Sequence, residues 1–150
     1  MSEDELWLSD VKVLDLSRLL PGPFCTLLLG DMGADVLKVE NPEGGDYARH
    51  YPPQVDGVGA FFSAVNRNKR SLTLNLKSER GVEILEELAE EADVLVESYR
   101  PGVMERLGVG REHLRSINPE LIVCAITGYG SDGPLVERAG HDLNYIARAG

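Results

Sequence analysis

A histidine and a tyrosine near the end of the 150-residue chain have the spacing of a proton-transfer pair. His141 precedes Tyr145 by four residues, and if the segment 141–149 is helical the two side chains lie one turn apart on the same face. A neutral imidazole, with a pKa of about 6.5, can take a proton near neutral pH, and its conjugate acid can return one. The spacing predicts a general acid–base site; the alternative is a histidine that simply caps the helix.

Two groups of basic residues could bind phosphate groups. Arg67, Lys69 and Arg70 put three positive charges into four residues directly before a predicted strand. Arg100 and Arg106 follow another predicted strand, at the end where open α/β sheets bind ligands. Arginine offers a phosphate a bidentate fork and lysine a point charge. The alternatives are a solvated positive edge for the first group and surface pairing with nearby glutamates for the second.

The overall charge, the cysteines and the hydropathy bear on which partners and which compartment the protein has. Lysine and arginine number 15 against 25 aspartates and glutamates, which gives a formal net charge of −10. This balance argues against a nucleic-acid partner, because phosphate neutralisation needs a basic surface. Cys25 and Cys124 match no metal or redox spacing, so they indicate buried apolar residues in a reducing compartment. The acidic amino terminus and the absence of an apolar run of about 20 residues favour a cytoplasmic protein without a membrane partner.

The order of the predicted elements indicates an α/β fold. Apolar or alternating runs predict strands at 11–16, 35–40, 71–76, 93–97 and 121–126. Helical spacing, prolines and glycines predict helices at 23–32, after Ser78, and at 103–107, 111–117 and 141–149. Strands that alternate with helices predict a Rossmann-like, doubly wound, mostly parallel sheet flanked by helices. Because the final helix has only begun at Gly150, we expect an incomplete large domain, the amino-terminal piece of a longer protein.

Two connections in this pattern bear on function. The turn 16–23 lacks the glycine spacing that lets a backbone approach a pyrophosphate, so dinucleotide binding is disfavoured. Glu40, at the end of the second predicted strand, is then either a solvated acid or a residue that shapes the following turn. The segment 47–66 shows no periodicity, and so long an irregular stretch predicts a functional loop.

The sequence resembles the class III CoA-transferases, the family of formyl-CoA transferase and carnitine-CoA transferase. The matching segments follow the family's order along the chain. They are 13–16, 21–24, 29–40, 44–46, 68–77, 93–97, 100–102, 107–108 and 126–130. Within the family, the segment Gly140-His-Asp-Leu-Asn-Tyr145 resembles the α-methylacyl-CoA racemases more than the formyl-CoA transferases.

The resemblance implies roles for particular residues. It matches His141 to a racemase base that exchanges the α-proton of a thioester, and Asp142 and Tyr145 to neighbours that line its pocket. It places basic residues in the CoA-binding part: Arg70, Lys77, Arg100 and Arg106, of which the last two are the better matched. It implies no metal and no permanently bound cofactor, since coenzyme A enters as a thioester substrate.

The resemblance also implies what lies beyond the chain. The family's Gly-Asp motif, its second domain and the carboxyl-terminal segment that returns to the first domain are not in residues 1–150. The aspartate of that motif is the second base of the racemases and the acylated residue of the transferases. Family members form interlocked homodimers, and we expect one for the full-length protein.

Three functions remain open from the sequence. The leading interpretation is an α-methylacyl-CoA racemase, whose residues 1–150 are inactive alone. The first alternative is a CoA-transferase that moves CoA between carboxylic acids, a reaction in which His141 has no necessary role. The second alternative is a non-catalytic CoA-binding module.

Overall fold

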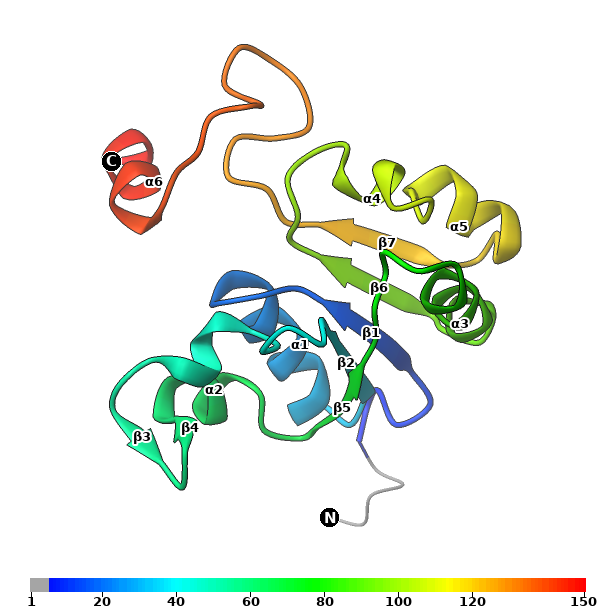
Figure 1. The fold of residues 1–150 in the computed structure, drawn as a ribbon, viewed down its shortest axis with the longest axis horizontal. Coiled ribbons are helices and arrows are strands. Elements are labelled where there is room, and N and C mark those ends of the chain that lie inside the picture. Colours follow the sequence, from blue (N-terminus) through cyan, green and yellow to red (C-terminus); the bar gives the residue numbers. More distant parts are fainter. Residues whose placement is uncertain (1–5) are drawn as a thin grey trace.

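A five-stranded parallel sheet forms the centre of the computed structural model, which describes residues 6–150 (Figure 1). The acidic residues 1–5 therefore lie outside the described part. The strands are β1 (Lys12–Leu16), β2 (Asp35–Glu40), β5 (Lys69–Thr73), β6 (Val94–Glu97) and β7 (Ile122–Ala125). Their order is β5-β2-β1-β6-β7, and all neighbours are parallel. The predicted α/β class is confirmed.

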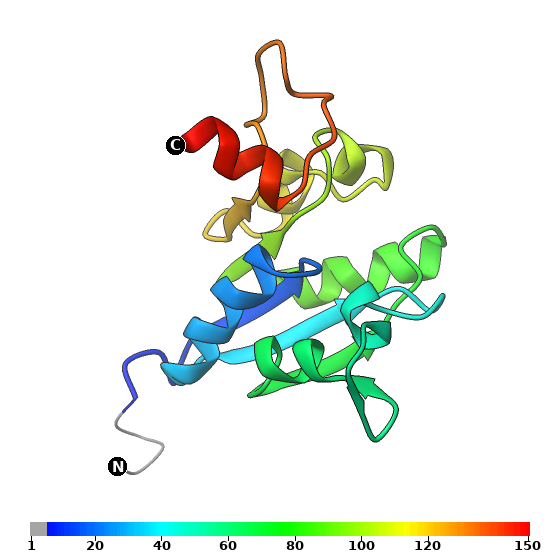
Figure 2. The same ribbon diagram turned by 90° about the vertical axis from the view of Figure 1, so that its left-hand side faces the viewer.

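Helices cover both faces of the sheet (Figure 2). The described residues form six α-helices: α1 (Pro21–Asp31), α2 (Ala60–Val65), α3 (Glu79–Glu90), α4 (Val103–Arg106), α5 (Arg111–Ile117) and α6 (Asp142–Ala149). The helix predicted at 23–32 begins two residues earlier, at Pro21, because a proline at the first position costs no hydrogen bond; Gly33 just beyond its end adopts a φ of 106°. The Ser78 hydroxyl caps α3 by accepting the Gly81 N–H at 3.2 Å. The helix boundaries thus follow the local signals in the sequence.

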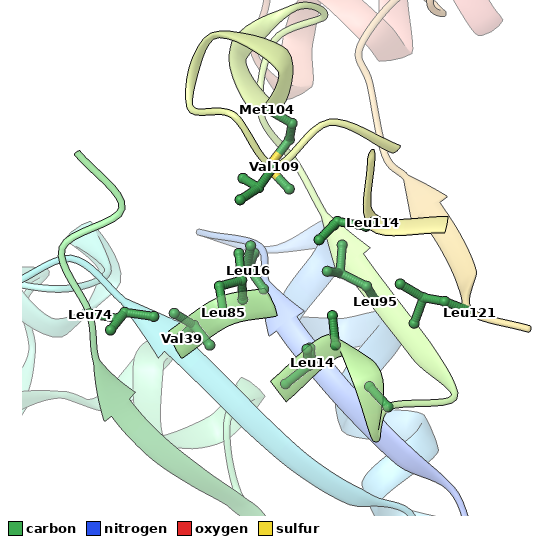
Figure 3. Close-up of a cluster of buried hydrophobic side chains, with 12 residues drawn as sticks. Leu14, Leu16, Val39, Leu74, Leu85, Leu95, Met104, Val109, Leu114 and Leu121 are labelled. Atoms are coloured by element: carbon green, nitrogen blue, oxygen red, sulfur yellow. The ribbon is translucent and has the colours of Figure 1, made fainter. Parts of the chain in front are cut away.

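The larger apolar core lies between the sheet and the helices α3, α4 and α5 (Figure 3). Leu14 and Leu95 from the central strands meet Leu85 of α3 and Leu114 of α5, and all four are at most 3% exposed. The α1 face has a smaller apolar cluster formed by Val13, Ala34, Val36 and Val96. Because strands alternate their side chains between faces, the residues next to this smaller cluster include the charged Asp15 and Lys38.

The third predicted strand begins two residues earlier than expected. It was predicted at 71–76, but the ladder with β2 runs from Lys69 to Thr73. Beyond Thr73 the Leu74 N–H still donates to the Glu40 carbonyl at 2.8 Å, and the Leu74 side chain is buried in the larger core. The leucine alternation correctly identifies side chains that face the core, but apolar packing continues past the last strand residue.

The segment 47–66 is more ordered than the sequence indicates. It contains the 3₁₀ helix η2 (Tyr47–His50), a hairpin of β3 (Gln54–Val55) with β4 (Val58–Gly59), and α2. The Asp46 carboxylate accepts the Ala48 N–H at 3.0 Å and so caps η2. Elements this short have no hydrophobic period, which is why the sequence predicts a loop here.

The helix α6 stands clear of the sheet beyond the carboxyl end of β7 (Figure 1). None of its residues is buried, and Leu143 and Ile146 are 80% and 56% exposed. Within the described part of the chain, no helix combines the length and the apolar character that crossing a membrane requires.

Candidate functional site

Four charged side chains are buried together on the α1 face of the sheet. Asp15, Lys38 and Asp46 are each at most 1% exposed, and the Lys69 side chain is 2% exposed. The Lys69 Nζ lies 2.9 Å from Asp15 Oδ2. The Lys38 Nζ lies 3.2 Å from Asp46 Oδ2 and 3.9 Å from Asp15 Oδ2. We call these residues the buried ion network; its two positive and two negative charges compensate one another, as burial demands.

Hydrogen bonds complete the environment of Asp15. Its carboxylate accepts the Thr26 hydroxyl at 2.6 Å, the Ser17 N–H at 2.9 Å and the Ser17 hydroxyl. Burial alone would raise the pKa of Asp15, but Lys38, Lys69 and these hydroxyls hold it below its ordinary value. Burial lowers the pKa of Lys69, and Asp15 offsets part of that change. The carboxylate is therefore a fixed charge at neutral pH.

Glu40 shapes the turn after β2 and is not a solvated acid. It is 7% exposed and accepts the Arg49 Nε–H at 2.8 Å, the Asp46 N–H at 2.9 Å and the Ser71 hydroxyl at 2.8 Å. The Arg49 guanidinium in turn lies 3.9 Å from the centroid of the Phe62 ring. Burial opposes ionisation, but these donors together lower the pKa of Glu40 from 4.5 to about 2. Of the two sequence interpretations, the turn-shaping one is confirmed.

A basic groove lies at the carboxyl edge of the sheet, beside the amino end of α3. It has a volume of about 550 Å³, and its lining includes Lys77, Ser78 and Arg106. Glu79 and Glu83 also line it, so the lining has no net formal charge, and we use the name basic groove only for the side that carries Lys77 and Arg106. The amino end of α3 adds the partial positive charge of the helix dipole. The structure thus brings together two of the four basic residues for which the family resemblance implies CoA binding.

The other two predicted CoA-binding residues do not line this groove. Arg100 is exposed in the loop after β6, at the same carboxyl edge of the sheet. Within residues 6–150, neither Arg100 nor Arg106 forms the expected ion pair with Glu97 or Glu105. Arg70 lies near the amino edge instead, where it forms two hydrogen bonds with Asp35, at 2.9 and 2.6 Å.

The basic segment 67–70 is neutralised within the protein. Arg67 pairs with Asp31 on the surface and Lys69 belongs to the buried ion network. Each of its three cations therefore has an aspartate partner, since Arg70 is bound to Asp35. The segment is therefore neither a phosphate-binding site with unpaired cations nor a purely solvated positive edge. Its charges join β5 to α1, β1 and β2.

Arg18 is a candidate functional residue that the sequence analysis misses. It follows β1, and its guanidinium carbon lies 5.5 Å from the Tyr47 ring centroid and 5.0 Å from the Tyr99 ring centroid. Its backbone N–H donates to the Ser98 hydroxyl, after β6, at 3.0 Å. The available signal was a cation in the turn after the first strand, at a position where α/β sheets bind ligands.

The residues 141–145 are placed at the start of α6. His141 is exposed and precedes the first helical residue, and its backbone N–H donates to Asn144 Oδ1 at 3.0 Å. The Tyr145 hydroxyl donates to the Gly140 carbonyl at 2.8 Å, and its ring packs edge-on against Tyr129 at 5.3 Å. Asp142 is exposed in the first turn. The Tyr145 hydroxyl is thus bonded to the Gly140 carbonyl, whereas the sequence spacing pairs it with the His141 imidazole. The general acid–base role of His141 stays a prediction.

The two cysteines and the possible metal ligands also bear on the sequence expectations. Cys25 and Cys124 are free thiols of intermediate exposure, so they are less buried than expected. Across the described residues, no group of three or more histidine, cysteine, aspartate or glutamate side chains is arranged to hold a metal ion.

The comparisons with known proteins agree with this architecture. The family model described as CoA-transferase family III matches residues 8–150. The chain belongs to this family. A succinyl-CoA:glutarate CoA-transferase of Mus musculus is 49% identical over 144 residues, which are 95% of this chain and 33% of that protein. A succinyl-CoA:mesaconate CoA-transferase of Haloarcula marismortui is 50% identical over 128 residues, or 82% of this chain and 32% of the relative.

Two solved structures show the same arrangement of elements. The Mycobacterium tuberculosis protein Rv3272 superposes with a TM-score of 0.88 at 43% identity, covering 95% of this chain and 40% of that one. A CAIB/BAIF family protein from Brucella suis gives a TM-score of 0.87 at 45% identity, covering 91% and 37%. The present chain spans about a third of the length of the two CoA-transferase relatives named above.

The environment of Glu40 predicts a specific acid sensitivity. Because its pKa falls from 4.5 to about 2 on folding, its contribution to stability is complete above the higher value and is lost as the pH falls through the lower one. Glu40→Gln should lower the denaturant midpoint at neutral pH, and the gap to the wild type should shrink as the medium is acidified. Glu112 is exposed, so Glu112→Gln is the matched control, and its denaturant midpoint should equal that of the wild type at every pH. A gap that is constant with pH would contradict the assignment.

Proposed function

We propose that this chain forms the CoA-binding amino-terminal part of a CoA-transferase that moves CoA between carboxylic acids. The observation that carries the proposal is the basic groove of Lys77 and Arg106 beside the amino end of α3, in a chain that belongs to family III. The relatives reported above are named as transferases for succinate, glutarate and mesaconate. They favour the transferase alternative over the racemase that the sequence analysis puts first.

The groove suits the phosphates of coenzyme A. A phosphate carries charge that Lys77 and Arg106 can neutralise, and the free N–H groups at the start of α3 can donate to its oxygens. Arg100 lies at the same edge of the sheet and adds a third cation.

The transfer itself requires a carboxylate nucleophile. A protein carboxylate attacks the acyl-CoA carbonyl to give a mixed anhydride and free CoA thiolate, which then attacks the anhydride to form an enzyme thioester and release the acid. The second acid reverses these two steps. The resemblance assigns the nucleophile to the Gly-Asp motif, so the part played by residues 1–150 is to bind and orient CoA.

The racemase is the second candidate, and the segment around His141 favours it. An exposed imidazole at the start of α6 is available to a substrate, and the resemblance gives it the role of one α-carbon base. The two functions differ in their need for this residue, because a transferase needs no α-proton exchange.

A homodimer agrees with the surface of α1. Phe24 and Leu28 of this helix and its two flanking residues, Leu20 and Met32, recur every four residues and are 43–48% exposed. A continuous apolar stripe of this kind is normally covered. It supports the interlocked dimer that the resemblance implies.

The basic groove predicts salt-dependent CoA binding. Lys77→Gln combined with Arg106→Gln should weaken CoA binding by about tenfold or more and should reduce its dependence on salt, since two screened charges are lost. Calorimetric titration at low and high salt measures both effects, and the exposed Arg115→Gln serves as the control. Equal affinities of the double variant and the wild type would contradict the groove. Arg70→Gln tests one of the two other members of the implied set; the pair of Arg70 with Asp35 predicts little change.

One assay separates the candidate functions. In the full-length protein, which supplies the Gly-Asp motif that the resemblance implies, the transferase should move CoA from succinyl-CoA to an added dicarboxylate, and His141→Ala should retain that activity. A racemase would exchange the α-proton of a 2-methylacyl-CoA with solvent deuterium, and His141→Ala would abolish exchange from one enantiomer far more than from the other. Exchange without transfer would overturn the proposal in favour of the racemase. CoA binding without either reaction would favour the non-catalytic module.

A further inference from the structure

Arg18 lies where the strand order of the sheet reverses. The chain builds from β1 through β2 to β5 and then returns to β6 on the other side of β1. Ligands of open α/β sheets bind outside the carboxyl ends of the strands at such a point. The Arg18 N–H and the Ser98 hydroxyl join the carboxyl ends of these two strands at 3.0 Å, so Arg18 stands directly at the crevice.

The guanidinium of Arg18 is held by aromatic rings and not by a carboxylate. Its central carbon lies 5.5 Å from the centroid of the Tyr47 ring and 5.0 Å from that of the Tyr99 ring. Within the described residues its guanidinium nitrogens form no ion pair and donate no hydrogen bond. By contrast, Arg49 and Arg70 each pair with an acidic side chain. The rings fix the position of the charge while leaving its N–H donors available.

The backbone around Arg18 is fixed by the buried ion network. Leu19 has a φ of 67°, an uncommon value for a residue with a side chain. Its N–H donates to Asp46 Oδ2 at 3.1 Å, and Asp46 is bound in turn to Lys38. A strained backbone held by several buried contacts is characteristic of a preorganised binding loop.

We infer that Arg18 binds an oxyanion of the substrate, a carboxylate of the acyl group or a phosphate of CoA, through the free fork of its guanidinium. The inference rests on the proposed CoA-transferase function and assigns it a specificity residue. A planar fork binds either group with two parallel hydrogen bonds, whereas a lysine at the same place offers a single point charge. Tyr47 and Tyr99 act as positioning residues for this cation.

Binding of unreactive CoA thioethers tests the inference. S-(3-carboxypropyl)-CoA replaces the thioester carbonyl of succinyl-CoA by a methylene group, and S-butyl-CoA is its counterpart without the carboxylate. Titration calorimetry with these two compounds and with CoA is carried out on the wild type, Arg18→Gln, Arg18→Lys and the control Arg115→Gln. A circular dichroism melt of each variant verifies that it is folded.

Arg18→Gln should weaken the binding of at least one of these ligands by about tenfold or more, and Arg18→Lys should recover only part of the lost affinity. A loss confined to S-(3-carboxypropyl)-CoA assigns the acyl carboxylate, and an equal loss for all three ligands assigns a phosphate. Unchanged affinities for all three ligands in both folded variants would overturn the inference. Failure of the wild type to bind any of the three would instead overturn the proposed function.

Discussion

Asp15 stands at the centre of the α1 face, and its negative charge has no access to solvent. A buried carboxylate is tolerated only with full compensation, which here comes from Lys69, Lys38 and the hydroxyls of Ser17 and Thr26. Removing one member of such a group leaves an uncompensated charge and costs about 3–5 kcal/mol. The positions of β2, β5, α1 and the turn after β1 are therefore constrained by one another.

This constraint reaches the carboxyl edge of the sheet, where we place the ligand. The Lys38 Nζ donates to the Ser17 carbonyl at 2.8 Å and also pairs with Asp46, so both loops beside Arg18 are fixed by one lysine. The basic groove depends on a different device, the capped amino end of α3 beside α4. Two independent supports thus position the cations at one edge: a buried ion network on the α1 face and an apolar core on the other.

The sequence predicts the parts of this structure that depend on local pattern. Strand and helix order and the cap at Ser78 follow from periodicity and turn chemistry, whereas the sequence leaves Glu40 open between a solvated acid and a turn-shaping residue. The role of Lys69 does not, because its partner Asp15 is 54 residues away and becomes adjacent only through the strand order. Arg18 is not predicted from the sequence, because the missing glycines of its turn argue only against a dinucleotide site. The acid–base role of His141 depends on which groups face α6, and local sequence pattern does not fix those groups.

Hydrogen exchange in Lys38→Met tests most directly whether the buried ion network holds the ligand edge. Loss of the lysine should increase exchange in peptides covering 17–22 and 44–50, while the amides of β6 stay protected at the wild-type level. Lys12→Met, which removes an exposed pair with Glu91, is the matched control and should leave both loops unchanged. Loops that exchange as slowly in Lys38→Met as in the wild type would contradict the account.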